Sequence, residues 1–112
     1  MKNKKWKELK QECLEQIDFD KCFTAMTAVG WVHAGYLHGD VKVNTALVTL
    51  ESIKETASYV LDFAIKNVKE DGEEGFCGTG GFEANAYKSK DGEKTLILKM
   101  VIADWEAWGY NE

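Results

Sequence analysis

The chain has 112 residues, which corresponds to one domain (residues 1–112) large enough to bury roughly two thirds of its unfolded surface. Its net charge of −5 argues against binding to nucleic acid or to acidic membranes, and is too small to indicate a DNA mimic. No segment approaches the roughly 20 apolar residues of a membrane span, and the basic N-terminus lacks the apolar stretch of a signal peptide.

The cysteine and proline content adds two expectations. Cys13, Cys22 and Cys77 form no Cys-x-x-Cys motif, and any disulfide would leave one of them unpaired. This pattern predicts a cytoplasmic protein with reduced thiols. Proline is absent, so the turns must rely on the ten glycines and on Asn and Asp.

Two amphipathic helices are predicted near the N-terminus. The first covers residues 3–17, and its apolar residues at helical spacing are Trp6, Leu9, Cys13, Leu14 and Ile17. Asp18 is suited to cap a second helix over residues 19–29, which ends at Gly30. The next segment, WVHAGYLHGD, has neither a helical nor a strand period, and we expect a short irregular connection there.

A third, longer amphipathic helix is predicted to begin after Thr49, its expected N-cap, and to end near Lys69. Its apolar stripe consists of Leu50, Ile53, Ala57, Val60, Leu61, Ala64, Ile65 and Val68. About 20 helical residues span roughly 30 Å, about the length of a nine-residue strand. We therefore expect this helix to cover a β-hairpin further along the chain. Residues 70–80, EDGEEGFCGTG, are predicted to form an acidic, then glycine-rich connector.

The hairpin is predicted over residues 81–103, with two strands around Asp91-Gly92. A three-residue loop, Lys90-Asp91-Gly92, gives one wholly apolar face, whereas a two-residue loop sorts the side chains poorly. The expected cross-strand pairs are Phe82 with Met100, Ala84 with Leu98, Ala86 with Leu96, and Glu83 with Lys99. The residues after the second strand, DWEAWGYNE, are predicted to form a tail.

The glycine-rich stretch is a candidate ligand site. Consecutive backbone N–H groups there could bind a phosphate, although the stretch is no Walker A loop and leads into a strand rather than a helix. An aromatic or histidine side chain of the 31–40 segment would then stack on a base. The predicted ligand-binding residues are Gly78, Thr79, Gly80, Gly81, Trp31, His33, Tyr36 and His38. The alternative is a simple turn that leads into the hairpin.

Signals for catalysis or for a metal are weak. His33 and His38, with Asp40 nearby, have no fixed third ligand, and this pattern is more typical of ordinary histidines than of a metal site. Cys77 would be a nucleophile only beside a histidine, and nothing in the sequence brings one there. The sequence has no paired-carboxylate or Ser-His-Asp signature, so we expect no catalytic site, cofactor or metal.

The aromatic residues outside the core stripes are a further candidate site, because Trp and Tyr are favoured at interfaces. The predicted contact residues are Trp105, Trp108 and Tyr110, which could also serve in a homo-oligomer. For Trp31 and Trp105 the alternative is that they close the two ends of a small core.

Four segments carry a resemblance to a known group of proteins: AVGWVHAG, TLESIKETASYVL, GTGGFEA and LILKMVIADWEAW. From about Met26 to Trp108 the chain resembles small proteins encoded by phages and prophages that have no assigned activity. Typical members have a proline before the cap of the long helix, whereas this chain has Val43-Asn44-Thr45 there. The resemblance implies a phage accessory protein acting in the host cytoplasm, including one that blocks a defence system.

Together these observations predict an α+β fold, in which N-terminal helices and one long amphipathic helix pack on a C-terminal antiparallel β-hairpin or small sheet. The predicted function is non-catalytic binding of a host protein through the aromatic tail and an exposed sheet edge. The alternative is sequestration of a phosphate-bearing small molecule such as a signalling nucleotide, and a small enzyme is the third hypothesis.

Overall fold

A computed structural model describes residues 4–28, 37–38, 41–42, 49–79, 81–89 and 96–110 of the chain. These residues form three helices, a four-stranded antiparallel sheet and a separate two-stranded ribbon. The elements are α1 (Trp6–Gln16), α2 (Phe19–Ala28), β1 (Leu37–His38), β2 (Val41–Lys42), α3 (Leu50–Asp71), β3 (Glu74–Thr79), β4 (Phe82–Lys88), β5 (Leu96–Ile102) and β6 (Trp105–Tyr110). The predicted α+β class is confirmed.

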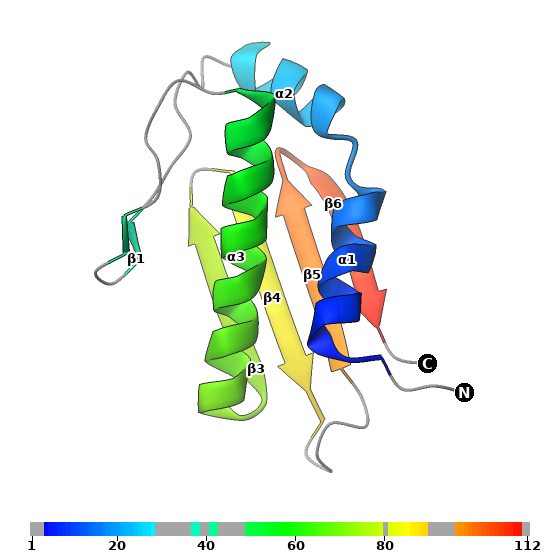
Figure 1. The fold of residues 1–112 in the computed structure, drawn as a ribbon, viewed down its shortest axis with the longest axis vertical. Coiled ribbons are helices and arrows are strands. Elements are labelled where there is room, and N and C mark those ends of the chain that lie inside the picture. The colour runs from blue at the N-terminus through cyan, green and yellow to red at the C-terminus, as the bar shows by residue number, and fades with distance from the viewer. Residues whose placement is uncertain are drawn as a thin grey trace.

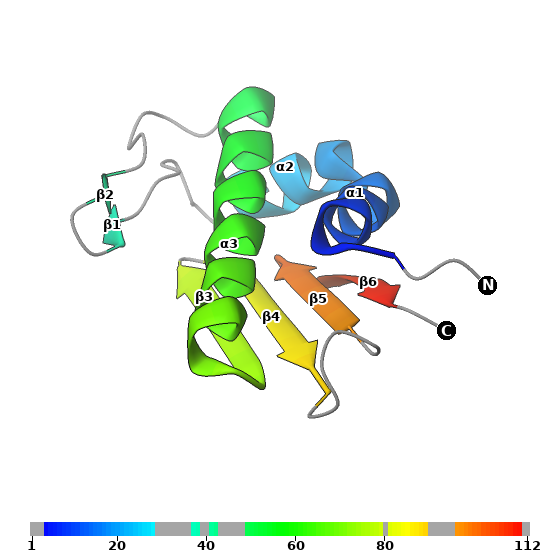
Figure 2. The ribbon, with the colours of Figure 1, turned by 60° about the horizontal axis from the view of Figure 1, so that its bottom comes forward.

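The molecule has two layers, with the helices on one face of the sheet (Figures 1 and 2). The strand order is β3-β4-β5-β6, so each strand pairs with its neighbour in sequence. α3 lies over β3 and β4, and α1 lies over β5 and β6. The expectation that the long helix covers the hairpin is therefore confirmed for β4 only, because the other strand of the hairpin, β5, lies mainly beneath α1.

The helices follow local sequence signals. Asp18 Oδ1 accepts a hydrogen bond from Lys21 N at 3.1 Å, as expected for the cap of α2. Thr49 Oγ1 accepts from Ser52 N at 3.0 Å, and Ser52 Oγ accepts from Thr49 N at 2.8 Å, so the start of α3 is capped in both directions. Gly72 ends α3, where its N–H donates to Val68 O at 2.9 Å.

The core lies between the helices and the sheet. Its buried residues are Trp6, Leu9, Cys13, Ile17, Cys22, Ile53, Ala57, Val60, Leu61, Ala64, Ile65, Val68, Cys77, Phe82, Ala84, Ala86, Leu96, Leu98, Met100, Ile102 and Ala107. The apolar stripes predicted for the first and third helices, and the apolar face predicted for the hairpin, supply most of them. The small Ala84 and Ala86 allow α3 to approach β4 closely.

The predicted pairing of the hairpin is wrong by two residues. Phe82 pairs with Ile102 rather than Met100, and the other predicted pairs shift in the same way. Lys99 therefore faces Asn85 rather than Glu83. A shift of two residues leaves every side chain on the same face, so the alternation of apolar residues determined the face but not the pairing. The predicted loop, Lys90-Asp91-Gly92, lies outside the described residues.

The predicted glycine-rich connector is also wrong, because residues 74–79 form strand β3. Position 75 of this strand requires glycine, because a Cβ atom there would lie 2.1 Å from Ala64 O and 2.3 Å from Val68 N of α3. The strand can lie directly beneath the helix only because this position lacks a side chain. Strand propensity depends strongly on such packing, which the sequence does not display.

The predicted tail is likewise a strand, β6, which pairs with β5 through a two-residue turn. Both turn residues have positive φ, 46° at Ala103 and 76° at Asp104, as in the tight turns that suit twisted antiparallel strands. Such turns usually contain Asn or Gly, so this pair of residues gave no turn signal. Near its C-terminal end β6 passes close to α1. A Cβ atom at position 109 would lie only 2.7 Å from Leu9 O, and this close approach is possible because the residue is glycine.

Candidate interface on the open sheet face

One face of the sheet is covered by the helices, and the other face, here called the open face, is covered by no described element (Figure 2). Successive residues of a strand point to opposite faces, and the buried positions identify the helix side. The pairing aligns the open-face residues in three rows: Glu74–Tyr87–Ile97–Tyr110, Phe76–Asn85–Lys99–Trp108 and Gly78–Glu83–Val101–Glu106.

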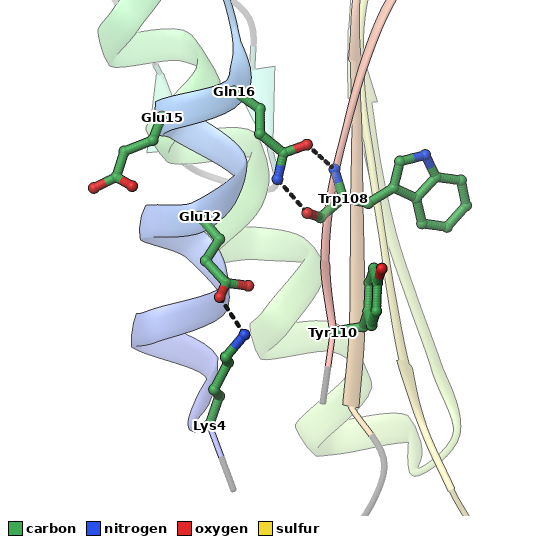
Figure 3. A pocket seen from close by; sticks show the side chains of 6 residues that line it. All are labelled: Lys4, Glu12, Glu15, Gln16, Trp108 and Tyr110. Carbon is green, nitrogen blue, oxygen red and sulfur yellow. Dashed lines mark hydrogen bonds and ion pairs between the residues drawn. The ribbon is translucent and has the colours of Figure 1, made fainter. Parts of the chain in front are cut away.

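Three large aromatic side chains are exposed on the open face. The exposed fractions are 53% for Phe76, 40% for Trp108 and 50% for Tyr110. Figure 3 shows Trp108 and Tyr110 pointing away from α1, on the far side of β6. Two of the three predicted contact residues are therefore together on one surface. Phe76 belongs to the same face, but the sequence offers no signal for it, because the glycines around it predict a connector rather than a strand.

Trp105, the third predicted contact residue, is separate from this surface. It pairs with Ile102, whose side chain is buried, so it belongs to the helix side of the sheet. Its ring lies beside α2, with Lys21 Nζ 5.4 Å from the ring centroid, and lines a shallow pocket of about 580 Å³ with α2 residues. Trp105 is 41% exposed, so it does not close the core as a buried residue would.

The charges of the open face are unevenly distributed. Lys99 stands in the middle row, with its Nζ 3.5 Å from Glu106 Oε1 and 5.0 Å from the centroid of the Trp108 ring. Its ammonium therefore holds the indole ring through a cation–π contact and pairs with a carboxylate in the next row. Glu74 and Glu83 add two further carboxylates towards the outside of the face. The open face thus carries exposed aromatic side chains on both of its edge strands, Phe76 on β3 and Trp108 and Tyr110 on β6, together with a mainly acidic border.

The backbone of Trp108 is fixed by α1 (Figure 3). Trp108 N donates a hydrogen bond to Gln16 Oε1 at 3.0 Å, and Gln16 Nε2 donates to Trp108 O. Gln16 and Trp108 line a shallow pocket of about 330 Å³, which the nearby Lys4–Glu12 ion pair also lines. Because one glutamine side chain satisfies both backbone groups, the outer edge of β6 is occupied at its centre, and the indole ring is presented from a fixed strand.

The outer edge of β3 is occupied to a smaller extent. Asn67 Nδ2 of α3 donates to Phe76 O at 2.8 Å. Beside this bond lies a pocket of about 320 Å³, lined by Asn67, Glu74, Gly75, Phe76, Asn85 and Tyr87. The pocket reaches from the strand edge to the aromatic residues of the open face.

The predicted phosphate site is only partly described. Gly78 and Thr79 lie in β3, opposite Glu83 and Phe82, so they form part of a ladder rather than a loop. Gly81, with φ of 94°, forms the turn into β4, and its carbonyl accepts a hydrogen bond from Ala103 N. Gly80, Trp31, His33, Tyr36 and the side chain of His38 lie outside the described residues. Phosphate binding therefore stays a prediction, with no observation on the described residues in its favour.

The three cysteines are buried, and none of them forms a disulfide. Burial, together with the nearby Glu12 carboxylate, raises the pKa of the Cys13 thiol to about 12. Burial and the nearby Asp18 carboxylate raise the pKa of Cys22 to about 11. Cys77, the candidate nucleophile, is buried beneath α3 on the helix side of β3. Among the described residues, no three His, Cys, Asp or Glu side chains are close enough together to hold a metal ion.

No family model, curated protein or solved structure matches this chain. Within the described part of the chain, no helix has both the length and the apolar composition needed to cross a membrane.

Proposed function

We propose that this chain is a non-catalytic binding protein that recognises another protein through its open face. The supporting observation is the exposure of Phe76, Trp108 and Tyr110 on one side of a sheet that no described element covers. An antiparallel sheet can face water, but its outward residues are then usually polar. Tryptophan and tyrosine are the residues that most often dominate the energy of protein interfaces.

The size of the open face suits a modest interface. Four strands of six or seven residues, spaced about 4.8 Å apart with about 3.3 Å per residue, give an area of roughly 400 Å². This area is only partly apolar, because each of the three rows contains at least one charged residue. A standard interface buries about 800 Å² on each partner, so we expect a transient complex unless further surface contributes.

The charge pattern indicates the kind of partner. Among the described residues, Lys99 is the one basic residue of the open face, and Glu106 already pairs with it. A polyanion would therefore find no unpaired cation there, whereas an apolar patch with basic residues at its border would match Glu74 and Glu83. We propose that the partner is such a protein. The phage-type resemblance adds the second part of the proposal, that the partner belongs to a host defence system.

The proposal is tested by photo-crosslinking in host cells. A photoreactive phenylalanine analogue at Tyr110 should capture a discrete partner, whereas the same analogue at Tyr59 should not. Tyr59 is a matched control, because it is 43% exposed but lies on α3, on the helix side of the sheet. Capture at both positions, or at neither, would contradict the proposal.

The captured partner is then purified and titrated with variants. Trp108→Ala removes the indole ring but keeps the backbone that Gln16 holds, so the fold should persist. We expect its Kd to rise by roughly 30-fold, corresponding to about 2 kcal/mol for an interface hot spot. Tyr59→Ala should leave the Kd unchanged. Equal affinity of Trp108→Ala and the parent protein would exclude the open face as the binding surface.

A further inference from the structure

The two edges of the sheet differ in how far their backbone groups are occupied. In β6, Trp108 has both its N–H and its carbonyl bonded to Gln16. In β3, Glu73 O accepts a hydrogen bond from Lys88 N, which places Glu73 among the residues that face β4. Antiparallel pairing alternates along a strand, so the backbone groups of Glu74, Phe76 and Gly78 face outward.

The outward groups of β3 are mostly without partners among the described residues. Asn67 Nδ2 bonds to Phe76 O, which confirms that this carbonyl faces outward. A carbonyl oxygen has two lone pairs, so Phe76 O can accept a second hydrogen bond. The N–H of Phe76 and both groups of Glu74 and Gly78 make no hydrogen bond to another described residue. Such a row of groups is a template for an added strand.

We propose that this edge binds a second copy of the chain, with the two β3 strands antiparallel about a two-fold axis at Phe76. In this arrangement Phe76 lies opposite the partner's Phe76, and Glu74 lies opposite the partner's Gly78. It is the one register in which all three outward residues of each strand meet outward residues of the other. Centring the axis on Glu74 would instead bring two carboxylates together, which destabilises a strand pair.

The side chains on the open face also suit a second copy. Residues directly opposite in an antiparallel pair share a face, so the two half-exposed Phe76 rings would meet across the axis, as aromatic cross-strand pairs do. The pocket beside Phe76, which Tyr87 also lines, offers space for the partner's ring. Glu74 meets only glycine, so the acidic side chain of each strand causes no like-charge contact.

The pairing would join two sheets into one of eight strands. The two open faces would form one surface of about 800 Å², the size of one side of a standard protein interface. Only this last consequence depends on the proposed function, and the pairing itself does not. The edge is short, so we expect a dimer that dissociates on dilution.

Sedimentation equilibrium over a wide concentration range tests the pairing with two matched variants. Gly78→Pro removes the outward N–H of residue 78 without removing a bond to β4, so it should weaken association at least tenfold while circular dichroism stays unchanged. Gly78→Ala keeps that N–H but displaces the Phe76 ring, so it should weaken association less than Gly78→Pro does. Phe76→Lys, which opposes two ammonium groups across the axis, should also give a monomer. A parent protein that is monomeric throughout, or a Gly78→Pro protein that still dimerises, would overturn the proposal.

Spin-label distances identify the edge that pairs. Glu83→Cys and Glu106→Cys place labels in the same row, on β4 and β6, while the native cysteines are buried. Pairing at β3 should give roughly 20 Å between the Glu83→Cys labels and roughly 35 Å between the Glu106→Cys labels. The reverse order would show pairing at β6 and would refute the proposal. Trp108→Ala should leave dimerisation intact, so failure of the proposed function and failure of this pairing are distinguishable.

Discussion

Replacing Gly75 with alanine is the sharpest test of how β3 packs beneath α3. The added Cβ atom would lie 2.1 Å from Ala64 O and 2.3 Å from Val68 N, well short of the 3.4 Å of ordinary contact. Both neighbours are backbone atoms of α3, so no side-chain rotation relieves the overlap, and the helix must move by about 1 Å. Overpacking of this kind costs about 1–3 kcal/mol, and we take the upper end because backbone must shift.

The unfolded state offsets part of this cost. Alanine restricts the unfolded chain more than glycine does, which returns about 0.4–1 kcal/mol. The expected net loss for Gly75→Ala is therefore about 2 kcal/mol. With an unfolding entropy of about 2.1 cal/mol/K per residue over 112 residues, Tm should fall by roughly 9 °C.

The measurement is urea and thermal unfolding followed by circular dichroism, with Gly78→Ala as the control. The Cβ atom of Gly78→Ala would meet mainly the exposed Phe76 ring, at 2.8 Å, and that ring can rotate away. We expect a change within about 0.5 kcal/mol for the control. Equal stability of the two variants would refute the close packing of β3 against α3, and with it the reason for glycine at position 75.

Three further predictions concern buried thiols, capping and the strand edge. Above about pH 9 the unfolded chain loses the Cys13 proton while the folded protein keeps it up to about pH 12, so the free energy of unfolding should fall as pH rises. In urea titrations at several pH values, Cys13→Ala should reduce that slope by about 1.4 kcal/mol per pH unit. An unchanged slope would contradict the raised pKa of Cys13. Thr49→Ala removes the side-chain cap of α3 and should cost about 1 kcal/mol in thermal unfolding, whereas no loss would mean that water replaces the cap. Gln16→Leu should lower the free energy of unfolding by about 1–2 kcal/mol and accelerate hydrogen exchange at the Trp108 amide. Gln11→Leu, on the same helix, should change neither quantity, and equal effects of the two variants would argue against the hydrogen bonds between Gln16 and Trp108.

The helices could be predicted from sequence because their signals are local. Apolar spacing defined the buried stripes, and Asp18 and Thr49 marked the starts of α2 and α3. These features involve residues three or four apart, which lie together in any helix. The packing of α3 on β4 also followed, because an apolar helix stripe and an apolar strand face each need a cover, whereas the packing of α1 on β5 was not predicted.

The outer strands and most of the candidate site required the tertiary structure. Gly75 is tolerated in β3 because α3 lies directly above it, and the Ala103-Asp104 turn is tolerated because two strands hold it in place. Phe76 became a candidate contact residue only once β3 was a strand. Trp108 and Tyr110 were predicted as contact residues, but their separation from Trp105 follows from the alternation of a strand that the sequence did not reveal.

The sequence alone determined the α+β class, the three helices and the face to which each hairpin side chain points. Those properties depend on periodicity, and a period of two or of 3.6 is visible in the order of residues. Only the tertiary structure decided the pairing of β4 with β5, the membership of β3 and β6 in the sheet, and the joining of Phe76, Trp108 and Tyr110 on the open face. These features depend on contacts between residues distant in sequence. When the pairing of two strands shifts by two residues, every cross-strand pair changes, but the alternation of side chains between the two faces stays the same.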